Sequence, residues 1–265
     1  MENFYVVHHE LGHIQYFMAY ENQSTIFQDG ASSAIHESLG DAIMNAAMSP
    51  QHLHRLGIIN LHRLGIITDD ELFSNSFDQF LLLKQALTKL PEIPFSLIMD
   101  KYRWDIFRGK ITEDKLNSAY WKMSEKIRGV VAPEQRGEEF FDAAGKFHIS
   151  DNTPYIRYFL SSILQMEIYK GLCEISLYGG YRPKGINYKE RHILPLHRCD
   201  IYGSKQCGKY LRNMMERGAS ITWSEALRIV VGKGTITTKP LLEYYKPIYR
   251  YLENYIKLYK IPVGW

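Results

Sequence analysis

The chain has 265 residues, of which 45% are hydrophobic and 13% aromatic, and its formal net charge is +3. This size and composition suffice for one large domain or two small ones, and they exclude an intrinsically disordered chain. The small net charge gives no case for a nucleic-acid-binding groove. The sequence has no run of eighteen apolar residues that would predict a membrane span, and its first residues lack the pattern of a signal peptide.

Apolar residues recur at helical spacing along the chain, without sustained strand alternation, and this pattern predicts a mainly α fold. The predicted helices are 4–20, 33–48, 77–90, 98–107, 112–128, 155–177 and 241–259. We interpret Ser33 and Thr112 as N-caps. Pro91 and Pro94 are expected to break or kink the helical pattern, and Pro247 to interrupt the last helix.

Other signals lie between these helices. Residues 53–59 nearly repeat as residues 61–67, and two copies are too few for a solenoid, so we interpret them as a local duplication or a gene-prediction error. Residues 179–192 form a loop rich in glycine and basic residues. Residues 222–225 are a capping box, and Gly232 follows where a helix is expected to end.

Cysteine and asparagine positions indicate little without knowledge of the compartment. The three cysteines, Cys173, Cys199 and Cys207, are too few for a disulfide scaffold, although one pair can bridge in an exported protein. Asn22 begins a glycosylation sequon, which matters only in a secretory setting.

The first predicted helix carries a motif with chemical meaning, His-Glu-x-x-His, formed by His9, Glu10 and His13. Residues four apart share a helix face, so the two imidazoles can bind one ion. A catalytic zinc site has three protein ligands and an open position for water, and Glu10 is placed to take a proton from that water. A five-residue match can also arise by chance on a polar helix face.

A second cluster on the next predicted helix strengthens the metal hypothesis. Glu37 and Asp41 are four residues apart and share a face. One carboxylate can bind the metal while the other accepts a hydrogen bond from a ligating histidine, which fixes the ring's orientation. A solvated acidic face is the alternative, but the neighbouring apolar residues favour burial.

The separation of 24 residues between His13 and Glu37 is characteristic of the gluzincins. Three blocks of sequence resemble the angiotensin-converting enzyme family of peptidyl-dipeptidases: residues 8–18, 36–41 and 146–159. Short agreements continue to the C-terminus. The resemblance implies a helical gluzincin domain in which Glu37 completes a zinc site with His9 and His13, and Asp41 supports a ligating histidine.

The family removes C-terminal dipeptides from peptides within a deep channel, and the resemblance extends to its substrate-binding residues. By resemblance, Lys146 and Tyr155 bind the terminal carboxylate of the substrate, and His148 and Tyr158 donate to the developing oxyanion. The carboxypeptidase relative, which removes one residue, lacks this lysine and tyrosine pair. The other implied roles are channel lining for Phe17 and Phe95, chloride binding for Arg157, and a disulfide between Cys173 and Cys199 that leaves Cys207 free.

Ordinary roles remain open for these residues. Lys146 and Arg157 can be surface charges, Tyr155 and Tyr158 can be packing residues, and His148 can be a structural histidine. Glu92 and Ser162 replace aromatic residues of the family, and Ser124 replaces an arginine of a second chloride site.

The chain begins at the predicted zinc helix, whereas the family's catalytic domain is much longer. We therefore interpret residues 1–265 as the C-terminal part of one peptidase domain, incomplete at its N-terminus. The upstream wall of the channel is then expected to be missing, which predicts an exposed apolar face.

The leading hypothesis is a zinc peptidyl-dipeptidase that acts on peptides, with Glu10, His148 and Tyr158 as catalytic residues and chloride as a second cofactor. One alternative is a fragment or isoform that binds zinc or peptides without turnover. Another is a different class of zinc metalloprotease, which leaves residues 146–158 unexplained. Family members are secreted or anchored at the cell surface, so we expect an extracellular location.

Overall fold

The computed structural model describes residues 2–57, 75–179 and 195–264. The regular elements within these ranges are helices, which confirms the predicted mainly α class. The chain divides into two compact units. The first unit comprises Met1–Leu83 and Ile163–Tyr251, and the second comprises Lys84–Ser162 and Leu252–Trp265.

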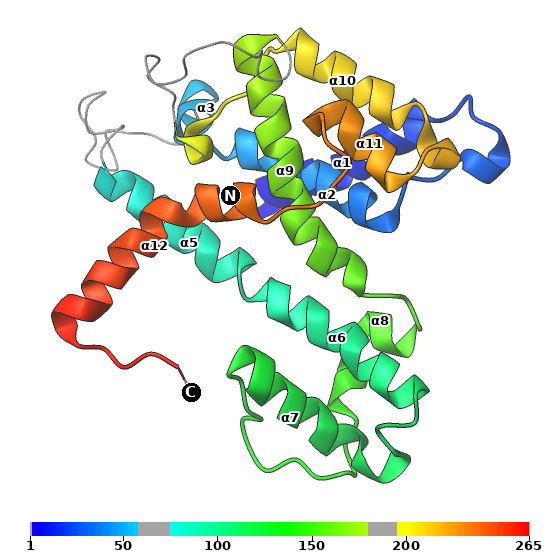
Figure 1. Ribbon diagram of the computed structural model, residues 1–265, viewed down its shortest axis with the longest axis vertical. Helices are drawn as coiled ribbons and strands as arrows, with labels where there is room; N and C mark the ends of the chain where they lie inside the picture. The colour runs from blue at the N-terminus through cyan, green and yellow to red at the C-terminus, as the bar shows by residue number, and fades with distance from the viewer. Residues whose placement is uncertain (1, 58–74, 180–194, 265) are drawn as a thin grey trace. The chain divides into compact units, whose positions relative to one another are not determined.

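The first unit is built around the long helix α9 (Ile156–Tyr178), most of which belongs to it. The helices that accompany α9 in this unit are α1 (Glu2–Ala19), α2 (Ser33–Ala47), α3 (Pro50–Arg55), α10 (Lys205–Met215) and α11 (Trp223–Val231) (Figure 1). α9 is buried around much of its circumference, because Leu164, Met166 and Ile168, which point to different sides of the helix, are all at most 2% exposed.

Specific contacts join α9 to three of its neighbours. The Asn45 amide of α2 donates to Gln165 at 3.3 Å, and the Cys207 thiol of α10 lies 3.1 Å from the Leu172 carbonyl oxygen. α11 approaches at Gly171, where a Cβ would lie 3.2 Å from the carbonyl carbon of Val230. The core of the first unit is therefore closed by α2, α10 and α11 around α9.

The second unit contains α6 (Glu92–Phe107), α7 (Leu116–Arg128) and the short helix α8 (Phe147–Ser150). Two 3₁₀ turns accompany them, η3 (Glu113–Lys115) and η4 (Asp142–Gly145). A small core holds the unit together, and its buried members are Ile98, Met99, Tyr102, Tyr120, Ala143 and Tyr155. The helices α5 (Asn75–Lys89), α9 and α12 (Lys239–Tyr259) contribute residues to both units.

The predicted helices are present, with corrections at their proline and cap positions. The cap of α2 is Ser32, not Ser33, because the Ser32 hydroxyl accepts from the Ile35 amide at 3.2 Å. Pro94 does not break α6, which begins at Glu92, because a proline in the first turn needs no amide hydrogen. Thr112 precedes the 3₁₀ turn η3 and makes no side-chain cap.

Of the remaining predictions of where helices begin and end, some are confirmed and some are wrong. Pro247 lies inside α12, which continues past it, and it removes the hydrogen bond that the Glu243 carbonyl would otherwise accept. The capping box at Thr222 and Glu225 and the stop at Gly232 are confirmed. α3 and α10 were not predicted. Most of the near repeat and of the 179–192 loop lies outside the described residues.

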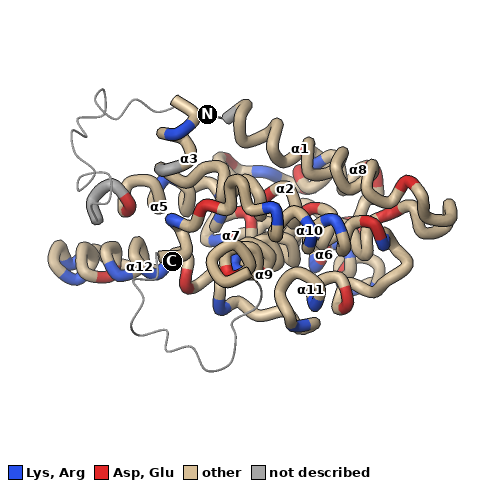
Figure 2. The backbone as a smooth tube through the Cα atoms, turned by 90° about the horizontal axis from the view of Figure 1, so that it is seen from above, with Lys and Arg blue, Asp and Glu red and all other residues tan. Residues whose placement is uncertain are grey.

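α1 carries the predicted exposed apolar face. Its exposed large side chains are between 46% and 59% accessible and are Val6, Val7, Leu11, Ile14, Phe17 and Met18. Acidic and basic residues are mixed along the described chain (Figure 2), in keeping with the net charge of +3. Among the described residues, no helix is both long and apolar enough for a membrane crossing.

Candidate metal centre

Two glycines bring α1 and α2 into backbone contact where the histidine motif lies. A Cβ on Gly12 would lie 2.5 Å from the Gly40 Cα, and a Cβ on Gly40 would lie 2.8 Å from the His9 Cα. A side chain at either position would push the helices apart. Gly12 and Gly40 therefore set the separation between the two helices that carry the predicted ligands.

The side chains of His9, His13 and Glu37 converge above this contact. The two Nε2 atoms are 3.2 Å apart, and the Glu37 Oε2 lies 3.6 Å from each of them. Tetrahedral zinc with bonds of about 2.0–2.1 Å needs ligand atoms roughly 3.3 Å apart. The donor set and its spacing therefore fit zinc. Among the described residues, this is the one group of three such side chains whose ligand atoms come this close.

Asp41 lies behind His9. Its Oδ1 atom is 3.0 Å from the His9 Nδ1 and also accepts a hydrogen bond from the Tyr5 hydroxyl at 2.8 Å. The hydrogen bond to Asp41 raises the pKa of His9, although burial opposes this shift. With Nδ1 as the donor to Asp41, Nε2 is the atom that faces Glu37.

Sequence reasoning placed Asp41 here but missed Tyr5 and His36. Tyr5 lies one turn before His9 on the same helix face, so its spacing was an available signal. The Nδ1 atom of His36 lies 2.5 Å from that of His13. Its position next to Glu37 in the sequence gave no indication of this contact.

Three residues with predicted roles in the first unit are accessible to solvent: Glu10, Phe17 and Asn22. Glu10 is exposed on α1, and its negative charge contributes to the raised pKa of His9. Phe17 is 46% exposed, and its ring centroid lies 5.0 Å from that of His36. Asn22 is exposed in the turn after α1.

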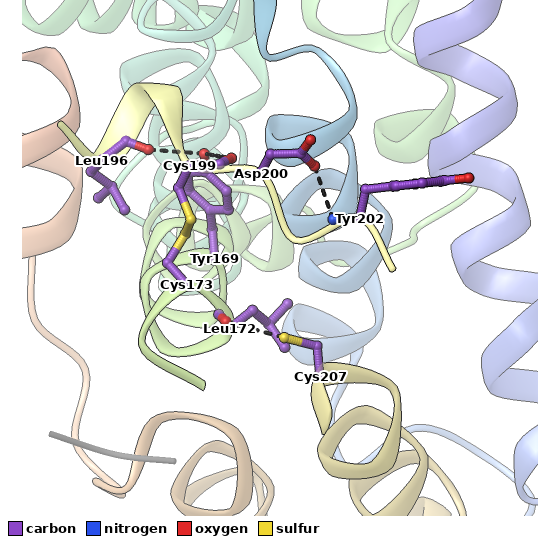
Figure 3. Close-up of a disulfide and its surroundings, with 8 residues drawn as sticks. All are labelled: Tyr169, Leu172, Cys173, Leu196, Cys199, Asp200, Tyr202 and Cys207. Carbon is purple, nitrogen blue, oxygen red and sulfur yellow. Dashed lines mark hydrogen bonds between the residues drawn. A yellow bond between two sulfur atoms is a disulfide. The ribbon is translucent and has the colours of Figure 1, made fainter. Parts of the chain in front are cut away.

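The disulfide expected from the resemblance is present in the first unit (Figure 3). Cys173 of α9 is joined to Cys199, with their Cα atoms 6.1 Å apart. The Tyr169 hydroxyl lies within hydrogen-bond distance of the Cys199 carbonyl oxygen, at 2.7 Å. Cys207 is a buried free cysteine, and burial raises the pKa of its thiol. A raised thiol pKa and burial make Cys207 a poor nucleophile.

The second unit brings together the predicted substrate-binding residues 146–158. The His148 Nε2 lies 3.1 Å from the Tyr158 hydroxyl, and the His148 and Tyr155 ring centroids are 4.8 Å apart. The Lys146 ammonium lies 5.2 Å from the Tyr155 ring centroid and 5.9 Å from that of Phe95. Burial, followed by the charge of Lys146, lowers the pKa of His148. Neutral donors and several cations, of which Lys146 acts most strongly on His148, therefore gather here.

A buried ion pair on α6 anchors this cluster. The Asp100 Oδ2 accepts from the backbone amides of Tyr155 at 2.8 Å and Ile156 at 2.7 Å. Arg103 pairs with Asp100 and donates to the carbonyl oxygens of His148 at 3.2 Å and Thr153 at 2.7 Å. Sequence reasoning did not identify this pair, because it connects side chains to backbone atoms about fifty residues away.

Arg157, the predicted chloride ligand, and two serines that differ from the family's residues make only local contacts. The Arg157 Nε donates to the Pro154 carbonyl oxygen of its own segment at 3.1 Å. The Ser124 hydroxyl is buried and lies 3.5 Å from the Arg128 guanidinium. Ser162 donates to the Tyr158 carbonyl oxygen at 2.8 Å. These contacts give no independent support for a chloride site.

Comparison with known proteins places the chain in a family. The family model described as angiotensin-converting enzyme matches residues 1–265. The chain is 39% identical over 252 residues to an angiotensin-converting enzyme of Haematobia irritans exigua, covering 95% of this chain and 38% of that protein. It is 36% identical over 265 residues to one of Mesocricetus auratus, covering 100% of this chain and 18% of that protein.

A third relative is the angiotensin-converting enzyme-related protein of Drosophila melanogaster, which is 37% identical over 262 residues. That match covers 99% of this chain and 39% of the relative. The chain thus spans well under half the length of these relatives. Because the family model covers the whole chain, this protein belongs to the angiotensin-converting enzyme family.

Proposed function

We propose that the chain supplies the zinc site and the substrate-binding block of a zinc-dependent peptidyl-dipeptidase, which releases C-terminal dipeptides from peptides. The observation that carries this proposal is the convergence of His9, His13 and Glu37, whose ligand atoms all lie within 4.8 Å of one another. Family membership supports peptidase chemistry in general.

The proposed chemistry assigns the proton transfers to Glu10. Zinc, when bound, supplies a Lewis acid that lowers the pKa of water and polarises a peptide carbonyl. Glu10 takes a proton from the attacking water and passes it to the leaving amine. Its exposure on α1 leaves its carboxylate open to water and substrate. Asp41 holds the His9 ring by its Nδ1 atom, so that Nε2 keeps its position.

Substrate recognition is proposed for the second unit. Lys146 and Tyr155 bind the terminal carboxylate of the peptide through charge-assisted hydrogen bonds. His148 and Tyr158 donate to the developing oxyanion, and the lowered pKa of His148 favours a neutral ring with one donor. Arg157 remains the proposed chloride ligand.

An extracellular location is part of the same proposal. The disulfide between Cys173 and Cys199 is typical of an oxidising compartment. The sequon at Asn22 lies on an exposed turn, where a glycan would meet no buried atoms.

A peptidase assay tests the activity. The purified chain is incubated with short peptides, with and without a zinc chelator, and the products are identified by mass spectrometry. We expect dipeptides to be released and the chelator to stop their release. Glu10→Gln should retain zinc but lose cleavage, whereas Glu21→Gln, an exposed glutamate beyond the end of α1, should cleave normally. Undiminished turnover in Glu10→Gln would refute its role as the base.

A second assay tests how the substrate is anchored. Lys146→Ala should raise KM for peptides with a free C-terminus and have a much smaller effect on C-terminal amides, which lack the charge. Lys126→Ala, which removes an exposed lysine from α7, serves as the control and should change neither value. Release of single residues in place of dipeptides would contradict the proposed specificity.

The alternative function is zinc or peptide binding without turnover. The observation that favours it is the row of apolar side chains exposed on α1, the helix that carries Glu10 and two proposed ligands. Such a face is expected to be covered in a complete active site. Stoichiometric zinc together with no dipeptide release in the first assay would support this alternative.

A further inference from the structure

We propose that His36 is a positioning residue that fixes the ring of His13 in the zinc-binding orientation. The proposal rests on the zinc site proposed above. In this proposal each ligating histidine is held by a residue of α2. His9 is held by the Asp41 carboxylate, and His13 is held by the His36 imidazole.

The two nitrogens of His13 have opposite surroundings. Its Nε2 faces the other proposed ligands, 3.2 Å from the His9 Nε2 and 3.6 Å from the Glu37 carboxylate. Its Nδ1 lies 2.5 Å from the Nδ1 of His36. The two ring centroids are 4.6 Å apart and the ring planes differ by 21°. Because the centroids are so much farther apart than the nitrogens, the rings meet edge to edge, which suits an in-plane hydrogen bond.

This contact determines how the protons are distributed. A zinc ligand is a neutral imidazole with a lone pair on the coordinating atom, so His13 keeps its proton on Nδ1. That N–H then donates to the His36 Nδ1, which must be unprotonated. His36 is therefore a neutral acceptor with its own proton on Nε2. Any rotation of the His13 ring away from the Glu37 carboxylate breaks this hydrogen bond.

The ring of His36 is itself held in place. The Tyr16 ring is almost parallel to it, with a centroid distance of 4.9 Å and an interplanar angle of 15°. Tyr16 is fully buried, and its hydroxyl accepts from the Ala31 amide at 3.1 Å. Gly30 packs closely against both rings, because a Cβ there would lie 2.9 Å from the His36 Cδ2 and 3.3 Å from the Tyr16 Cε1. His36 is therefore a preorganised acceptor.

A neutral acceptor at this place has an electrostatic advantage. Glu37 and Asp41 already bring two negative charges to the site, which offset the charge of a divalent ion. A carboxylate behind His13 would add another negative charge and weaken the field that polarises a substrate carbonyl. An imidazole orients the ligand without that loss.

The test measures zinc affinity by competition with a chromophoric chelator on the full chain. His36→Ala is expected to bind zinc about 10–100-fold more weakly, as is typical when the hydrogen-bond partner of a ligand is removed. His36→Asn places an amide oxygen near the position of the lost Nδ1 and should recover most of the affinity. His54→Ala, which removes an exposed histidine from α3, should bind as the wild type does.

Imidazole NMR provides a readout that a purely structural role would not move. In the zinc-loaded wild type, the Nδ1–H protons of His9 and His13 should both be protected from solvent exchange. His36→Ala should lose the His13 signal and keep that of His9, which Asp41 still binds. Thermal unfolding of the zinc-free variants shows whether each one is folded.

The outcomes separate this inference from the proposed zinc site. If the wild-type chain takes up no zinc, both the proposed zinc site and the role of His36 are refuted. A wild type that binds zinc, with a folded His36→Ala variant of equal affinity, overturns the role of His36 alone. If His36→Ala fails to fold, an intact His13 Nδ1–H signal in zinc-loaded wild type supports the inference, and its rapid exchange refutes it.

Discussion

The two candidate clusters of this chain are held in place by opposite means. In the first unit, His9, His13 and Glu37 come from two helices whose backbones touch at Gly12 and Gly40. In the second unit, the segment 146–158 is tied to α6 by the buried ion pair of Asp100 and Arg103. One cluster depends on the absence of side chains, and the other depends on buried charge.

This difference predicts which substitutions each cluster tolerates. A helix contact through glycine fails when a single methyl group is added, although the chemistry of the ligands is unchanged. A buried ion pair fails when one charge is removed, because the other is left uncompensated. The two clusters should therefore respond to different substitutions, and neither kind should affect both.

The largest effect is expected for Asp100→Asn. The substitution leaves Arg103 without its counter-charge. It also replaces the carboxylate, which accepts hydrogen bonds from two backbone amides, with a side chain amide that has only one acceptor oxygen. The free energy of unfolding should fall by about 3–5 kcal/mol in urea denaturation. Zinc affinity should remain within twofold of the wild type, roughly the scatter of independent sites. Asp114→Asn, in an exposed 3₁₀ turn of the same unit, is the control. A loss no larger than that of the control would show that the pair does not hold the cluster.

Gly40→Ala should produce the next largest effect, with the opposite pattern. Alanine normally stabilises a helix relative to glycine, but here its Cβ would collide with the backbone of His9. We expect a loss of about 1–3 kcal/mol in the free energy of unfolding and a marked loss of zinc affinity. In α10, a Cβ on Gly208 would have no other atom within 4 Å, so Gly208→Ala should be neutral or stabilising. Equal behaviour of the two variants would disprove the close helix contact.

Two carboxyl groups, one in each unit, should make the free energy of unfolding depend on pH in opposite directions. In the second unit, the Arg136 guanidinium, helped by Trp121, holds the pKa of Asp142 well below its ordinary 3.8. The stability that Asp142 contributes is therefore present above pH 3.8 and is lost as the pH falls below it. In the first unit, burial raises the pKa of Glu167 above 4.5. Its contribution is present below pH 4.5 and is lost as the pH rises through the folded-state pKa.

Urea denaturation between pH 2 and pH 7 checks these signs. Glu167→Gln should stabilise the protein at pH 7 and remove the decline above pH 4.5, because a neutral amide replaces a buried charge. Asp142→Asn should remove the decline below pH 3.8. Parallel pH profiles for the wild type and either variant would refute the assignment for that residue.

The smallest effect is expected for Tyr5→Phe. This substitution removes one hydroxyl that shares the Asp41 carboxylate with His9, and it leaves the His9 contact in place. Zinc affinity should fall by about 2–10-fold, the equivalent of one hydrogen bond. A competition assay with a chelator measures it. Tyr210→Phe, which removes a hydroxyl group from α10, is the control and should bind zinc as the wild type does. A larger loss than for His36→Ala would reverse the proposed order of importance.

Local spacing was sufficient to predict most of the helices, though not α3 or α10, and to place the candidate ligand side chains on shared helix faces. Four-residue intervals within α1 and α2 place His9 with His13 and Glu37 with Asp41 on shared faces. The contacts of His36 and of the Asp100–Arg103 pair were not predictable in this way. Each depends on a particular ring orientation or on backbone atoms of a distant segment.

The glycines illustrate the same limit. Gly12 and Gly40 have helical neighbours and helical conformations, so propensity alone describes them as weak points in α1 and α2. Only the packing shows that α1 and α2 cross at these two residues. The N-cap of α2 differs from its prediction for a smaller reason, because Ser32 and Ser33 are equivalent by residue type and only the backbone conformation distinguishes them.

X-ray absorption spectroscopy of the purified chain, loaded with one equivalent of zinc, can detect the proposed ligands themselves. If His9, His13 and Glu37 bind the ion, the spectrum should show four-coordinate zinc with two imidazole ligands and oxygen donors, and His13→Ala should leave one imidazole. A spectrum without two imidazoles, or one that His13→Ala does not change, would contradict the site.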